Sequence, residues 1–186
     1  SDVGLGVDHV DYAVGGVTAT VASGPGSRLQ PRPAALADTA CVDSTQLADG
    51  TYGTALTATD TGADGNRSAS ISGVVRVDNT APSVVYGAPA DPEARLPQAV
   101  LTTTDGASGV ARLTASIDGV PAVLKTTGSS TTVAPAVPLS DGQHLLVWQA
   151  VDVAGNAATG TEILGVLDTT PPVIDDAQPQ GLAAPT

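Results

Sequence analysis

The amino-acid sequence predicts an all-β protein that consists of two tandem β-sandwich domains. Hydrophobic residues make up 41% of the 186 residues, but Phe and Met are absent and aromatic residues reach only 2%. Burial therefore depends on Val, Leu, Ile and Ala, which suit pleated sheets better than helices. The 21 Gly and 14 Pro residues punctuate the chain every few positions, as turns between short strands require. About seven short strands in ninety residues are typical of an aligned sandwich.

One long segment of the sequence occurs twice, at a spacing of about ninety residues. The first copy runs from Leu47 to Pro82, and the second runs from Leu139 to Pro172. Both copies contain an Asp-Gly turn, a strand that ends in Asp, a Gly-Asn hairpin and an ending of the form Asp-Asn/Thr-Thr-Ala/Pro-Pro. A repeat of this length predicts two domains of similar structure.

The repeat also defines the expected domain boundaries, at residues 1–80 and 81–170. Residues 82–101 lead into the second copy, whereas the first copy begins at the equivalent of Thr104 and so lacks its lead-in strand. Residues 171–186 match the lead-in of a further copy. We therefore expect that segment to be either the start of another repeat or an exchanged C-terminal strand.

Each copy opens with a predicted hairpin. Residues 10–14 alternate apolar and polar side chains, and residues 113–117 do the same, which indicates half-buried strands. Residues 15–16 (Gly-Gly) and 118–119 (Asp-Gly) follow, and both pairs favour two-residue turns because such turns need positive φ. The returning strands are expected at residues 17–21 and 120–124.

The first copy is longer because of a Pro- and Ala-rich insertion at residues 29–43. Length differences between copies usually fall in surface loops, and long loops often carry binding sites. Cys41 lies in this insertion and is the only cysteine, so it cannot form an internal disulfide. We expect a buried small residue there, with an intermolecular disulfide or a thiol attachment as the alternative.

The strongest strand predictions fall at residues 52–60 and 144–152. Trp148 lies on the face that both copies share, so we expect its side chain in the core. The opposite face consists of Gly, Ala and Thr in the first copy but is apolar in the second, at Leu145, Val147 and Val151. An apolar outer face in one copy predicts a covering neighbour or partner.

Each copy ends with a predicted hairpin loop, a last strand and a proline segment. The loops fall at residues 60–66 and 152–156, where Gly and Asn tolerate a left-handed backbone. The last strands reach Val77 and Leu167, and the prolines that follow stiffen the chain. Consecutive domains are therefore expected to form a semi-rigid rod.

The charge of the chain disfavours several classes of partner. The net charge is −12, and only 7 residues are Lys or Arg, so binding to nucleic acid or to anionic lipid is not expected. No apolar run approaches the roughly 20 residues of a membrane span. The start of the chain lacks the features of a signal peptide, so any targeting segment would be removed or lie outside this sequence.

Aspartates placed at equivalent positions are the candidate metal ligands. Seventeen of the 19 acidic residues are Asp, and calcium prefers six to eight oxygen ligands, often carboxylates. The candidates end strands, follow the last strands or open a turn: Asp60, Asp78, Asp105, Asp152 and Asp168. The alternative interpretation is that they cap turns by accepting backbone N–H bonds, since no Asp-x-Asp-x-Asp loop is present.

The sequence contains no arrangement that is typical of a catalytic site. His9 and His144 are the only histidines, and with a single cysteine they make a zinc site improbable. No paired-carboxylate motif or phosphate-binding glycine loop is present. A carbohydrate site would need exposed aromatic side chains, and Trp148 is expected inside. We therefore expect a protein that is not an enzyme.

The order of strands, Asp-Gly turn, Ala-Gly-Asn hairpin and Asp-Asn/Thr-Thr-Ala/Pro-Pro ending resembles the tandem immunoglobulin-like (Big-type) repeats of bacterial surface proteins. The resemblance covers nearly the whole chain except residues 29–43. It implies two immunoglobulin-like domains in an extracellular, non-enzymatic structural repeat of the stalk or adhesin type. It also implies that the partners are neighbouring repeats or identical subunits, and that calcium at the junctions stiffens the array.

Two alternatives to a spacer follow from the sequence. The chain could be a subunit of a surface filament in which residues 172–186 complete the next subunit by strand exchange. It could instead be a module that binds a surface or carbohydrate ligand through residues 29–43. A phage virion protein built from the same modules is compatible with either alternative.

Overall fold

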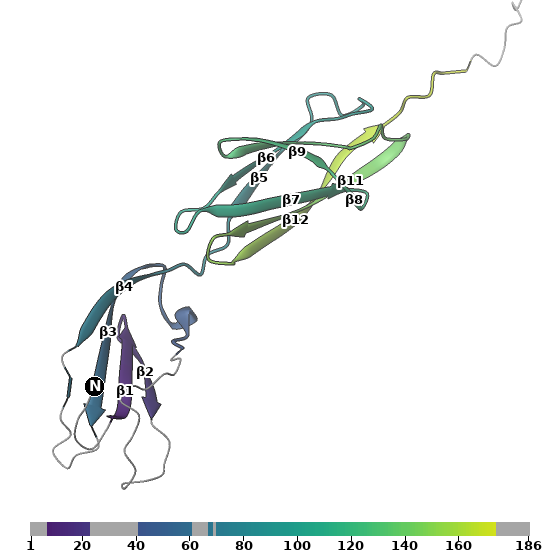
Figure 1. Ribbon diagram of the computed structural model, residues 1–186. Helices are drawn as coiled ribbons and strands as arrows, with labels where there is room; N and C mark the ends of the chain where they lie inside the picture. Colours follow the sequence, from purple (N-terminus) through teal and green to yellow (C-terminus); the bar gives the residue numbers. More distant parts are fainter. Residues whose placement is uncertain (1–6, 23–40, 61–66, 69, 174–186) are drawn as a thin grey trace, which may run out of the picture. The chain divides into compact units, whose positions relative to one another are not determined.

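The protein is all-β, with three antiparallel four-stranded sheets (Figure 1). The computed structural model describes residues 7–22, 41–60, 67–68 and 70–173, which contain twelve strands, one 3-10 helix and no α-helix. None of the described residues lies in a helix long and apolar enough to cross a bilayer. The chain divides into two compact units. Unit 1 consists of Ser1–Pro82, Asp105–Gly109 and Asp152–Asn156, and unit 2 of Ser83–Thr104, Val110–Val151 and Ala157–Thr186.

The described residues of unit 1 form one sheet with the strand order β2-β1-β3-β4. Its elements are β1 (Val7–Val14), β2 (Val17–Ala22), the 3-10 helix η1 (Ser44–Gln46), β3 (Gly50–Asp60) and β4 (Ile71–Val77). The predicted Gly-Gly turn is confirmed, since Gly15 and Gly16 have φ values of 55° and 90° and Val14 pairs with Val17. The core of the unit is built on Val14, Leu47 and Val77.

Unit 2 contains two sheets with the strand orders β5-β6-β10-β9 and β12-β11-β7-β8. The first consists of β5 (Ser83–Gly87), β6 (Ala99–Thr104), β9 (Val123–Thr127) and β10 (Ser130–Ala134). The second consists of β7 (Val110–Ile117), β8 (Val120–Pro121), β11 (Gly142–Asp152) and β12 (Ala157–Leu167). Asp118 and Gly119 form the predicted turn between β7 and β8, with φ values of 51° and 81°.

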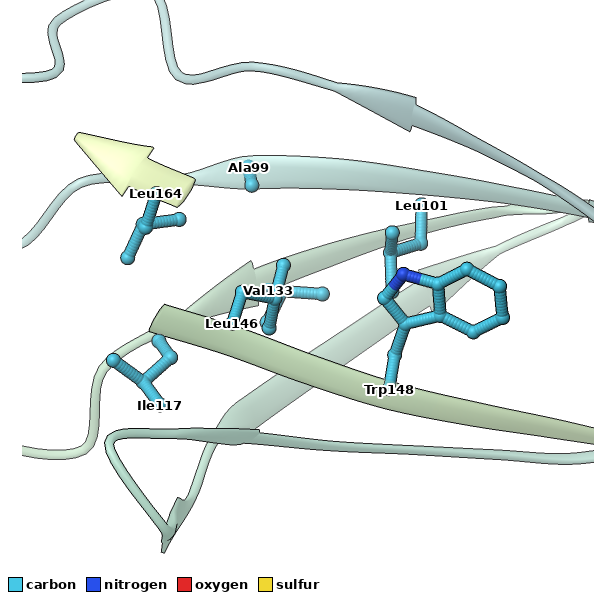
Figure 2. Packing of buried hydrophobic residues seen from close by; sticks show 7 residues of the cluster. All are labelled: Ala99, Leu101, Ile117, Val133, Leu146, Trp148 and Leu164. Carbon is cyan, nitrogen blue, oxygen red and sulfur yellow. The ribbon is translucent and has the colours of Figure 1, made fainter. Parts of the chain in front are cut away.

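Both sheets of unit 2 contribute to one hydrophobic core, in a sandwich-like arrangement. Figure 2 shows the buried side chains of the two sheets directed toward one another: Ala99, Leu101, Ile117, Val133, Leu146, Trp148 and Leu164. Alternate residues of β11 point into this core, as the period of two predicts. Trp148 is 9% exposed, so its predicted burial is confirmed.

Two details of the sequence prediction are wrong. Residues 120–124 do not form one returning strand, because β8 pairs with β7 whereas β9 pairs with β10 in the other sheet. Pro121 has no N–H to donate to a ladder, and the chain changes sheet at Ala122. Cys41 is exposed rather than buried. It lies outside the strands, in the stretch that leads to η1.

The remaining loop predictions lie mostly outside the described residues. Three segments lie outside them: residues 29–40 of the predicted insertion, residues 61–66 of the first predicted hairpin loop and residues 174–186 of the C-terminal segment.

The predicted apolar outer face of unit 2 is confirmed. Leu145 and Val147 of β11 are 43% and 41% exposed, and Leu145 pairs with Ile163 of β12, which is 55% exposed.

Candidate functional site

An aspartate at the start of β11 fixes the chain where it leaves β12. Asp141 Oδ1 accepts hydrogen bonds from Thr169 N at 2.8 Å and from Thr169 Oγ1 at 2.5 Å. Asp141 Oδ2 accepts a further hydrogen bond from Thr170 Oγ1. These bonds lower the pKa of Asp141 to about 2 because they favour the charged carboxylate. The hydrogen bond from the Thr169 hydroxyl has the largest effect. We call this arrangement the Asp141 clamp.

Unit 1 contains the same arrangement, the Asp49 clamp, at the start of β3. Asp49 Oδ1 accepts a hydrogen bond from Asn79 N at 2.6 Å, and Asp49 Oδ2 accepts one from Thr80 Oγ1. Asn79 Nδ2 also donates to Leu47 O at 2.9 Å. The two copies of the repeat therefore use one device to hold the chain that leaves their last strand.

Asp78 and Asp168 occupy equivalent positions directly after the last strand of each copy. Asp78 Oδ1 accepts a hydrogen bond from Thr80 N at 3.1 Å, and Asp168 Oδ1 accepts one from Thr170 N at 3.0 Å. Both aspartates thus cap the turn that leads to the prolines, which is the alternative role given to these residues above. Asp78 makes further contacts inside unit 1.

Three of the five predicted metal ligands come together in unit 1. One carboxylate oxygen from each of Asp78, Asp105 and Asp152 lies within 4.8 Å of the others, and we call this group the acidic triad. Asp78 and Asp152 are only 8% and 2% exposed, and Asp105 is half-buried. Asp60 and Asp168 are not part of any such group in the described part of the chain.

Backbone amides orient the three carboxylates of the triad. Asp78 Oδ2 accepts a hydrogen bond from Ser108 N at 2.8 Å, and hydrogen bonding from Ser108 lowers the pKa of Asp78. Asp105 Oδ1 accepts bonds from Ala107 N and Gly109 N at 3.2 and 2.6 Å. Each oxygen has more than one lone pair, so these bonds leave capacity for a cation.

The third carboxylate is positioned by Asn156, which the sequence predicted only as a turn residue. Asn156 Nδ2 donates to Asp152 Oδ2 at 2.7 Å and to Asp78 O at 3.0 Å, and Asn156 N donates to Asp152 Oδ1 at 2.8 Å. Asn156 thereby links two members of the triad. The signal in the sequence was the Gly-Asn pair, which occurs at the same place in both copies.

The donor set of the triad fits a hard divalent cation. Three carboxylates this close repel one another unless a positive charge is added. They offer only oxygen atoms, which calcium prefers, and backbone carbonyls or water would have to supply the remaining ligands of a six- to eight-coordinate ion.

Comparison of the chain with protein-family models and with curated proteins finds no match.

Proposed function

We propose that the chain is a non-enzymatic structural repeat of an extracellular bacterial protein, built from two immunoglobulin-like sandwich domains. The observation that carries this proposal is the clamp that occurs twice, with Asp49 and Asp141 as its centres. Each clamp holds the segment that leaves the last strand of its copy, which is where a load along a chain of repeats would act. A repeat of this kind has neighbouring repeats or identical subunits as its partners.

Mechanical unfolding of the full chain tests the proposed load-bearing role. When single molecules are pulled from both ends, we expect the substitution Asp141→Asn to lower the unfolding force of one event and to leave the other unchanged. Asp91→Asn is the matched control, because Asp91 only caps a loop in unit 2 through Glu93 N. Equal unfolding forces for the native chain and Asp141→Asn would contradict the proposal.

The acidic triad supports a second part of this proposal, namely that calcium joins the segments of unit 1. Asp78 follows β4, and the other two ligands come from the segments 105–109 and 152–156. A bound ion would hold all three segments together. A ligand stabilises the state that binds it by about 2.7 kcal/mol at a concentration of one hundred times its Kd.

Thermal unfolding with calcium and with a chelator tests the ion. We expect saturating calcium to raise the Tm by about 10 °C, and Asp105→Asn to abolish that rise. Asn at this position keeps an oxygen for the amides of Ala107 and Gly109. Asp168→Asn is the control, since Asp168 is the counterpart of Asp78 in the second copy but lies outside the triad. A Tm that calcium does not change would exclude this part of the proposal.

One observation favours the filament alternative. Leu56 of β3 is 39% exposed, whereas Trp148, which holds the same place in β11, is 9% exposed. In unit 2 a second sheet covers the corresponding face. A strand supplied by another subunit could cover the face of β3 in the same way and bury Leu56. Light scattering of the full chain and of a chain without residues 172–186 distinguishes the cases. Polymers that disappear with the deletion support strand exchange, and a monomer in both samples excludes it.

A further inference from the structure

His144 of β11 and Tyr52 of β3 occupy equivalent places in the two copies of the repeat. Tyr52 Oη donates a hydrogen bond to Ala48 O at 2.8 Å. His144 Nε2 lies 2.8 Å from Ser140 O, the equivalent carbonyl in the second copy. Both rings therefore bind the backbone four residues before them, and one polar contact of the ring is conserved between the units.

The turn residue that faces each ring also differs between the two copies, and its size fits the size of the ring. Gly15 has a φ of +55° beside Tyr52, and a Cβ atom at Gly15 would lie 2.5 Å from Tyr52 Cδ1. Asp118 occupies the equivalent place beside His144 with a φ of 51°. The smaller imidazole ring leaves room for the aspartate side chain, and Asp118 Oδ2 lies 2.6 Å from His144 Nδ1. The pairs Tyr52–Gly15 and His144–Asp118 are thus two solutions for one position of the fold.

The contacts of His144 require a particular protonation state. Both ring nitrogens face oxygens that only accept hydrogen bonds, namely the Asp118 carboxylate and the Ser140 carbonyl. Only the imidazolium, which carries a hydrogen on each nitrogen, satisfies both acceptors. The side chain of His144 is 9% exposed and that of Asp118 is 42% exposed, so water can reach the carboxylate but little water is available to the ring.

Asp118 is itself held in place by β11. Its Oδ1 accepts a hydrogen bond from Leu145 N at 2.9 Å, and its backbone N donates to Leu145 O at 2.9 Å. A change in the contact between Asp118 and His144 therefore acts directly on the junction of the β7–β8 turn with β11.

We propose that His144 and Asp118 form a pH-dependent latch that ties the β7–β8 turn to the start of β11 and releases it when the imidazolium loses its proton. Unit 1 has no such latch at the equivalent position, because Tyr52 and Gly15 replace the pair. The latch gives unit 2 a response to pH that is additional to its proposed structural role.

The direction of the response follows from the surroundings of the ring. Hydrogen bonding and charge from Asp118 and the Ser140 carbonyl raise the pKa of His144 above its ordinary value of 6.5, and this effect exceeds the opposing effect of burial. The hydrogen bond from Leu145 N lowers the pKa of Asp118, and the hydrogen bond between Asp118 and His144 lowers it further. On the neighbouring strand β12, the residue opposite His144 is the uncharged Gly165. Asp118 is therefore the charged group that determines the state of the ring.

A group whose pKa is raised by folding stabilises the fold below its unfolded pKa and loses this effect as the pH rises through its folded pKa. The contribution of His144 is thus complete below about pH 6 and declines above pH 6.5. Each unit by which folding raises the pKa corresponds to a change of about tenfold in the folding equilibrium constant. The contribution of Asp118 has the opposite direction and is lost in acid, below pH 3.8.

Urea unfolding of the full chain at several pH values between 5.5 and 9, followed by Trp148 fluorescence, tests the latch. Trp148 is the only tryptophan and lies in the core of unit 2, so its signal reports that unit. We expect the urea midpoint of the native chain to fall as the pH rises. His9→Gln is the control and keeps this fall, because His9 lies in unit 1 beside Asp8 and Asp11.

Two variants separate the latch from other effects of pH. In Asp118→Asn the amide oxygen can accept from Leu145 N while the amide N–H₂ donates to a neutral Nδ1. The folded state then favours the neutral ring, so we expect that the midpoint no longer falls as the pH rises. The double variant Asp118→Gly with His144→Tyr copies the arrangement of unit 1, and it should be more stable than His144→Tyr alone and equally insensitive to pH. A flat profile for the native chain, or an undiminished slope in both variants, would overturn the proposal.

Discussion

A single glycine determines how the only tryptophan is packed. Gly160 of β12 lies directly opposite Trp148 of β11, and a Cβ atom at Gly160 would come within 2.2 Å of the indole ring. The ring therefore lies against the backbone of the neighbouring strand. Trp148 Nε1 finds no hydrogen-bond partner among the described residues, so the packing of the ring must compensate for a buried N–H group.

We predict that Gly160→Ala destabilises unit 2 by about 1–3 kcal/mol, because the added methyl group overpacks the site and forces the indole ring to move. Urea unfolding followed by Trp148 fluorescence measures this change. Gly87→Ala in β5 is the matched control, since the nearest atoms to a Cβ there lie at an ordinary 3.5 and 3.6 Å. Equal stability of the two variants would show that the close approach at Gly160 is not a constraint.

Sequence reasoning identified the place of Trp148 but not the partner that makes room for it. The alternation in residues 144–152 predicts an inward side chain because successive residues of a strand point to opposite faces. The register between β11 and β12 selects Gly160 as the facing residue, and a bulge between His144 and Leu145 shifts this register. Alternation within one strand contains no information about that bulge.

At the scale of the element, β11 separates two leucines that are adjacent in the sequence. Leu146 is completely buried and Leu145 is 43% exposed. We predict that Leu146→Ala costs about 2–5 kcal/mol, because it removes buried methyl groups and leaves a cavity. Leu145→Ala should cost less than about 1 kcal/mol, since the side chain keeps contact with water. The free energy of unfolding from urea titrations compares the two, and similar losses would contradict the assignment of the faces.

The strands illustrate where prediction of elements succeeds. The two-residue turns at Gly15 and Asp118 followed from their residue types, because positive φ is a local requirement. The division of residues 120–124 between β8 and β9 did not follow. Both the preceding strand β7 and the following strand β10 are near in the sequence, and the short sequence around Ala122 is compatible with pairing to either.

At the scale of the whole molecule, the core clusters that the described residues form differ in size between the two units. Seven buried residues form the core cluster of unit 2, and three form that of unit 1 among the described residues. A smaller core provides less stabilisation from burial. We predict that unit 1 unfolds at a lower urea concentration than unit 2. Far-UV circular dichroism should therefore begin to change before Trp148 fluorescence does, and coincident transitions would show that the units unfold together.

The sequence by itself determined the all-β class, the tandem repeat, the faces of β11 (but not those of β3, where Leu56 of the predicted inward face is 39% exposed and Thr59 of the outward face only 8%) and the turns that need positive φ. These features depend on a residue and its near neighbours, so they are encoded locally. The tertiary structure alone decided that Asp105 and Asp152 meet Asp78 while Asp60 and Asp168 stay outside the acidic triad. It also decided that His144 meets Asp118. Such contacts join residues 26 to 74 positions apart, and they arise only when strand pairing and loop closure bring distant turns to one place.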